Sequence, residues 1–142
     1  MTKVQFHILP HTRAPLAWQY VCGLVEKLYD EQPESIYLHT DSKADAERLN
    51  DLLWTYRDDG FLPHQLYQPN ATDTPPRIQI GFAENPGLNG TLINLSQQVP
   101  SFYCDFKQII EIVFTDPVVQ QLGRERFRFY RTQGCDINTR KL

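Results

Sequence analysis

The fold is set by residues 3–40, which read KVQFHILPHTRAPLAWQYVCGLVEKLYDEQPESIYLHT. Apolar residues alternate with polar ones over residues 3–9, which is typical of a β-strand. An apolar, helix-like segment follows, and Pro15 lies near its first turn, where a helix tolerates proline. A second short strand is predicted over residues 35–40. The segment therefore predicts the strand and helix alternation of an α/β protein.

The rest of the chain extends this alternation. Two more strands are predicted over residues 77–82 and 91–95. Three more helices are predicted: one capped by Asp41 or Ser42, one over residues 102–114 capped by Ser101, and one that Asp116-Pro117 begins and Gly134 ends. We therefore expect a single open, mainly parallel sheet with helices on both faces, a Rossmann-like fold.

Length and composition predict one domain over residues 1–142. A chain of 142 residues with 41% hydrophobic residues can close a real core. No apolar run approaches the ~20 residues of a membrane helix, and the apolar part of the N-terminus is too short for a signal peptide. Cys22, Cys104 and Cys135 share no metal-binding spacing and are typical of reduced thiols. We expect a cytoplasmic protein without a zinc site.

The nucleotide site common in such folds is missing from the sequence. Phosphate-binding glycines normally follow the first strand and open the first helix. Residues 9–15 contain no glycine, and no GxxxxGK[ST] motif occurs elsewhere. The sequence therefore predicts a Rossmann-like fold without a phosphate-binding glycine loop, and we expect no cofactor.

The histidines give no positive argument for an enzyme. They could be metal ligands or general bases, but no Ser/His/Asp or Cys/His set stands out by spacing: His7, His11, His39 and His64. His7 and His39 lie in predicted strands, which favours a hydrogen-bonded structural role. Cys22 lies within a helical pattern and is expected in the core. We predict no catalytic residues.

The last helix is basic, although the chain is acidic. Residues 120–142 carry six Lys or Arg against two Asp or Glu, whereas the net charge of the whole chain is −3. One face of the helix combines charge with an aromatic ring: Arg124, Phe127, Arg128 and Arg131. The opposite face is predicted to meet the core: Val118, Leu122, Phe129 and Tyr130. Arg126 points toward this core side and is assigned to an internal ion pair.

Two interpretations of the basic face remain open. It can be a solvated face, with the Phe127 ring packed under arginine stems or the C-terminal tail. It can equally be a site for an acidic peptide with an apolar anchor, which needs both the charges and the ring.

A second surface surrounds Trp54. Trp54 falls off the apolar stripe of its helix, and Phe61, Leu62 and Pro63 follow closely. The residues predict either an exposed apolar patch that binds a partner or a local core under the next loop.

Taken in order, these stretches resemble the chi subunit family of bacterial DNA polymerase III. The resemblance is carried by the following segments: Val4-Gln-Phe-His-Ile-Leu, Leu53-Trp with Phe61-Leu-Pro-His64, Leu92-Ile-Asn-Leu95, Phe102, Phe106, Glu111, Leu122-Gly-Arg-Glu-Arg-Phe-Arg-Phe-Tyr-Arg131, Gly134 and Ile137-Asn-Thr139. It spans nearly the full chain. The Trp54–His64 block and the basic helix are together fairly specific.

The resemblance implies a non-catalytic accessory subunit of the clamp-loader complex in DNA replication. Such a subunit joins the psi subunit and the C-terminal tail of single-stranded DNA-binding protein, an acidic tail that ends in Pro-Phe with a free carboxylate. Its contact with DNA is indirect and it has no membrane partner. By position, the tail-binding residues are Arg124, Phe127, Arg128, Arg131, Val113 and Gln120. The best-known members have a lysine at the position of Gln120 and a tyrosine at that of Phe127, so tail binding here is expected to be weaker or to depend more on apolar burial.

The same resemblance implies a second interface. Trp54 and Phe61 match the aromatic pair that faces psi, with Leu62, Pro63 and His64 beside them. A helicase is an alternative partner of this surface.

Two alternative functions are a nucleotide-using enzyme and a DNA-binding protein. One is a nucleotide-using enzyme on the same fold, against which the missing glycines argue. The other is direct DNA binding by the basic helix. The net negative charge argues against a general nucleic-acid binder, because neutralising phosphates needs clustered positive charge over a broad surface.

Overall fold

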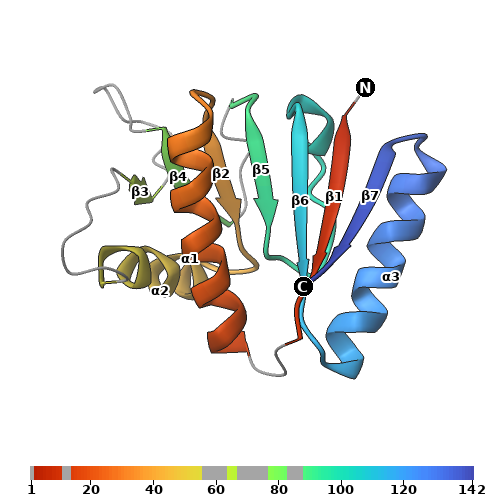
Figure 1. Ribbon diagram of the computed structural model, residues 1–142, viewed down its shortest axis with the longest axis horizontal. Coiled ribbons are helices and arrows are strands. Elements are labelled where there is room, and N and C mark those ends of the chain that lie inside the picture. The colour runs from red at the N-terminus through yellow and green to blue at the C-terminus, as the bar shows by residue number, and fades with distance from the viewer. Residues whose placement is uncertain (1, 11–13, 56–63, 67–76, 83–87) are drawn as a thin grey trace.

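The protein is built on one seven-stranded sheet with the strand order β3-β4-β2-β5-β6-β1-β7 (Figure 1). A computed structural model describes residues 2–10, 14–55, 64–66, 77–82 and 88–142. The strands are β1 (Lys3–Ile8), β2 (Ile36–His39), β3 (His64–Leu66), β4 (Ile78–Gly81), β5 (Thr91–Asn94), β6 (Gln108–Val113) and β7 (Asp136–Lys141). All six strand pairings are parallel, which confirms the predicted open α/β sheet.

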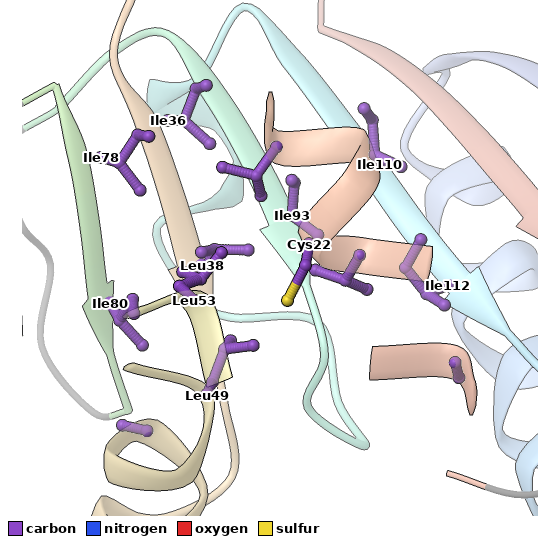
Figure 2. Packing of buried hydrophobic residues seen from close by; sticks show 14 of the residues in the cluster. Cys22, Ile36, Leu38, Leu49, Leu53, Ile78, Ile80, Ile93, Ile110 and Ile112 are labelled. Carbon is purple, nitrogen blue, oxygen red and sulfur yellow. The ribbon is translucent and has the colours of Figure 1, made fainter. Parts of the chain in front are cut away.

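Helices cover both faces of this sheet, as expected. The helices are α1 (Ala14–Glu31), α2 (Lys43–Thr55) and α3 (Pro117–Thr132), with a short 3-10 helix η1 (Tyr103–Asp105). Side chains of neighbouring strand residues point to opposite faces, so each face has its own core. Leu38 packs in the core under α1 and α2, whereas Tyr37 packs in the core under α3 and η1. Figure 2 shows the first core, in which Cys22 and Leu49 meet strand residues such as Ile93.

The helix ends follow the capping residues in the sequence. The Asp45 N–H donates to Ser42 Oγ at 3.2 Å, so Ser42 caps α2. The Asp116 carboxylate accepts from two backbone N–H groups of the first turn of α3, at 3.0 and 3.1 Å. Gly134 adopts a φ of 78° just beyond α3, where glycine is favoured. The predicted limits of α3 are therefore confirmed.

The predicted helix over residues 102–114 is wrong. The segment holds η1 and then strand β6, which lies between β5 and β1 near the middle of the sheet. Phe102 and Phe106 are four residues apart, a spacing that is also typical of one face of a helix. In the structure they flank η1 in the sequence, and both rings pack in the same core. Ile109, Ile110 and Ile112 divide between the two faces, since a central parallel strand is buried on both sides.

Two edge strands were not predicted. β3 has only three residues, and β7 reads DINTRK with most of its side chains exposed. Neither carries the apolar alternation that marks a strand, because an edge strand buries little surface. Within the described segments, no helix is long and apolar enough to cross a membrane.

Candidate functional site

A groove of about 460 Å³ lies between α3 and the sheet face formed by β6, β1 and β7. From α3 it is lined by Gln120, Gly123, Arg124, Phe127, Arg128 and Arg131. From the strands it is lined by Phe6, Ile8, Val113, Thr139 and Lys141. Of the apolar strand residues, Phe6 and Val113 are buried and Ile8 is half-buried, whereas the arginines are exposed. The groove therefore combines an apolar floor with a cationic rim.

Gly123 lets α3 approach the sheet at this groove. A Cβ atom at position 123 would lie 3.0 Å from Cγ2 of Val113 and 3.8 Å from a guanidinium nitrogen of Arg126. These neighbours leave little room for a larger residue. The close approach sets the width of the groove beside Val113.

The orientation of α3 is fixed by a buried carboxylate from β6. Glu111 is fully buried; its Oε1 accepts from Arg126 Nε at 2.8 Å, and its Oε2 accepts from Tyr130 Oη at 2.6 Å. Asn94 Nδ2 donates to the same Oε2 at 2.9 Å, and the Arg126 guanidinium also donates to the Gln97 carbonyl at 3.0 Å. The predicted internal ion pair of Arg126 is confirmed. Because Arg126 and Tyr130 face the core, the other arginines turn toward the groove and solvent.

The protonation of this network supports its structural role. Burial raises the pKa of Glu111 above its ordinary value, while the Arg126 guanidinium and the donors from Asn94 and Tyr130 act in the opposite direction. All three partners donate, so the carboxylate is the form that satisfies them. Burial and the Glu111 charge raise the pKa of Tyr130, which keeps its hydroxyl a donor.

All six residues predicted for tail binding line the groove: Val113, Gln120, Arg124, Phe127, Arg128 and Arg131. The structure brings them together across two elements, since Val113 ends β6 and the others lie on α3. What they bind stays a prediction. Phe127 was expected to stand outside the core, which is only half right. Its ring is half-buried, with its centroid 5.4 Å from that of Phe6, and it also forms part of the groove wall.

The predicted core face of α3 is partly wrong. Val118 is 66% exposed and Phe129 is 39% exposed, whereas Tyr130 is buried as expected. The side of α3 that meets the core carries Gly123, Arg126 and Tyr130. Gly123 and Arg126 are not hydrophobic, so the sequence does not mark this face as buried. Arg126 can be buried because its partner is the Glu111 carboxylate and not an apolar surface.

Five further residues line the groove that the sequence pattern did not indicate: Phe6, Ile8, Gly123, Thr139 and Lys141. A signal existed for two of them, because Phe6 and Ile8 alternate in the first predicted strand. Thr139 and Lys141 belong to β7, whose polar sequence predicts no strand.

The second predicted surface is described only in part. Trp54 lies near the end of α2 and is 47% exposed, so its ring reaches the surface. His64 begins β3, which packs against α2. Phe61, Leu62 and Pro63 lie outside the described residues. In Figure 1, α2 and β3 lie at one edge of the sheet and α3 at the other.

His7 and His39 are both buried, away from the groove. His7 is hydrogen-bonded on both ring nitrogens, as predicted, to Tyr20 and to Gln5. His39 is also buried, with its ring edge-on to Phe102 at 5.4 Å between centroids. Its Nδ1 has no hydrogen-bond partner within the described part of the chain, so the hydrogen bond expected for His39 is not found at that atom.

The fold and the groove together define an α/β protein with an apolar groove that is rimmed by cationic side chains. The chain belongs to the family "DNA polymerase III chi subunit, HolC", whose sequence profile matches residues 1–138. It is 34% identical to the DNA polymerase III subunit chi of Pseudomonas aeruginosa over 143 aligned residues, which cover 100% of this chain and 98% of that protein. The chi subunit of Haemophilus influenzae is 29% identical, and the match covers 97% of this chain and 96% of that protein. The chi subunit of Escherichia coli is 24% identical, and the match covers 85% of this chain and 82% of that protein. The resemblance stated from the sequence is thus confirmed.

Proposed function

We propose that this protein is a non-catalytic accessory subunit of the DNA polymerase III clamp-loader complex and acts in DNA replication. Its groove would bind the acidic C-terminal tail of single-stranded DNA-binding protein. Family membership supports the accessory role. The observation that carries the proposal is the groove itself: an apolar floor with Arg124, Arg128 and Arg131 at its rim and no Asp or Glu among the described residues that line it.

The chemistry of the groove suits such a tail. A phenyl ring at the end of the tail can pack against Phe6, Phe127 and Val113. This contact would bury apolar surface of both the ring and the groove, which favours binding. The terminal carboxylate and the acidic side chains can accept from guanidinium groups, which bind carboxylates through two parallel hydrogen bonds. A volume of about 460 Å³ is enough for a short peptide end but not for a duplex.

The surface at Trp54 is proposed to bind the psi subunit. Phe61, Leu62, Pro63 and His64 would complete this interface, and a helicase is the alternative partner. The exposed Trp54 ring supports the proposal, because aromatic residues are enriched among interface hot spots. The protein would work in the cytoplasm, with indirect contact to DNA and no cofactor.

The experiment is calorimetry with an acidic peptide that ends in Pro-Phe. We expect Arg128→Ala to weaken binding by at least about 1–2 kcal/mol, since an interface arginine loses its carboxylate partner. Arg48→Ala is the matched control, because Arg48 is an exposed arginine on α2, outside the groove. Amidation of the peptide terminus should weaken binding to wild-type protein.

Three binding measurements, with peptide, DNA and nucleotide, separate the candidate functions. Equal affinities of wild-type, Arg128→Ala and Phe127→Ala proteins would remove the tail-binding assignment. Strong binding of DNA without any partner protein would favour direct DNA contact. Saturable binding of ATP or NAD would favour the enzyme.

A further inference from the structure

Lys141 brings a fourth cation to the groove from a different element. It is the last residue of β7 and lies past residue 138, where the family match ends. β7 pairs in parallel with β1, and the register places Lys141 beside Ile8. Side chains of paired residues in neighbouring strands point to the same face of a sheet. Ile8 and Lys141 both line the groove, so Lys141 lies on the face of the sheet that α3 covers.

The neighbouring residue, Arg140, points to the opposite face. Its register partner is His7, whose ring bonds to Tyr20 of α1, on the other side of the sheet from α3. The positive charge of Arg140 also helps to lower the pKa of His7. Lys141 and Arg140 are thus adjacent, exposed and equally charged, but only Lys141 belongs to the groove.

The position of Lys141 along the groove matters. α3 starts just after the carboxyl end of β6, and β7 ends at this same end of the sheet, where Figure 1 marks the C-terminus near the start of α3. Gln120 lies in the first turns of α3, at this end. It is the uncharged member of the polar series Gln120, Arg124, Arg128 and Arg131 that faces the groove. Among the described residues that line the groove, Lys141 of β7 is therefore the cation at the end where α3 offers an amide.

We propose that Lys141 binds a carboxylate of the acidic peptide at the Gln120 end of the groove. The inference rests on the proposed peptide-binding function and assigns a residue outside the family match to it. An exposed ammonium acts as a hydrated point charge, so its contribution depends on distance and falls with salt. A peptide lying in the groove would then meet cations on both walls, from α3 and from β7.

The test compares charge reversals at two adjacent positions. Affinity for an acidic peptide that ends in Pro-Phe is measured by calorimetry for Lys141→Glu and Arg140→Glu. Both variants change the net charge equally, but only the first places a carboxylate in the groove. We expect a loss of roughly tenfold for Lys141→Glu and less than about threefold for Arg140→Glu at 0.15 M salt, where the screening length is about 8 Å.

Two further variants complete the experiment. Adding Gln120→Lys to Lys141→Glu should recover most of the affinity, because it restores a cation at the same end of the groove. Equal losses for Lys141→Glu and Arg140→Glu, while Arg128→Ala still weakens binding, would overturn the role of Lys141 and leave the proposed function standing. Unchanged binding in Arg128→Ala would remove both. Thermal unfolding of each variant checks that α3 and β7 remain in place.

Discussion

The ring of His7 is held neutral by its surroundings. It is 2% exposed, with Nδ1 2.7 Å from the Tyr20 hydroxyl and Nε2 2.8 Å from Gln5 Oε1. Since Oε1 can only accept, the Nε2–H donates to it and Nδ1 accepts from the tyrosine. Burial first, and then the charges of Arg140 and Lys27, lower the pKa of His7 from 6.5 to about 4.

This lowered pKa predicts acid sensitivity of the fold. Between pH 6.5 and pH 4 the unfolded chain binds a proton that the folded protein does not, so the free energy of unfolding should fall as pH falls through this window. The loss from His7 is at most about 3–4 kcal/mol, at 1.36 kcal/mol per unit of pKa. Urea unfolding of wild-type and His7→Gln proteins at several pH values measures it. Equal losses of stability in the two proteins would show that another group is responsible.

At the scale of elements, α3 was predictable at its ends and on its groove side, but not toward the core. Asp116 and Gly134 set its limits by local chemistry, which the sequence shows directly. The arginine spacing placed the basic face by helical geometry alone. The core side depends on Glu111, a partner from β6, and the segment containing it was predicted to be helical. Interactions between residues distant in the chain leave no local pattern, which also explains why β7 was missed.

The Glu111–Arg126 pair therefore predicts a division of roles between two arginines of α3. Arg126→Ala should lower the free energy of unfolding by about 3–5 kcal/mol, because it leaves the buried Glu111 carboxylate without its cation. Arg124→Ala removes an exposed charge and should change stability by less than about 0.5 kcal/mol, yet weaken peptide binding. Chemical denaturation of both variants gives the comparison. An Arg126→Ala protein as stable as Arg124→Ala would contradict the structural role of the pair.

At the scale of the whole molecule, the strand order separates the two proposed interfaces. The sequence indicated both surfaces, but not where each lies on the sheet. β3 and β7 form opposite edges, so the Trp54 side and the groove side are separated by the width of the sheet (Figure 1). Strand order depends on which distant segments pair, and the intervals between motifs do not encode this. With the proposed interfaces at opposite edges, binding of one partner would leave the surface for the other uncovered.

This separation predicts that the two interfaces act independently. Trp54→Ala should reduce capture of the psi subunit in a pull-down while changing peptide affinity by less than about twofold, because effects at distant sites without shared partners add. Arg128→Ala should weaken peptide binding and leave capture of the psi subunit unchanged. Leu16→Ala is a matched control for loss of an exposed apolar side chain, since Leu16 is 42% exposed on α1. Unchanged psi capture by Trp54→Ala would remove Trp54 from the interface. A peptide affinity that falls as far in Trp54→Ala as in Arg128→Ala would instead show that the two edges of the sheet are coupled.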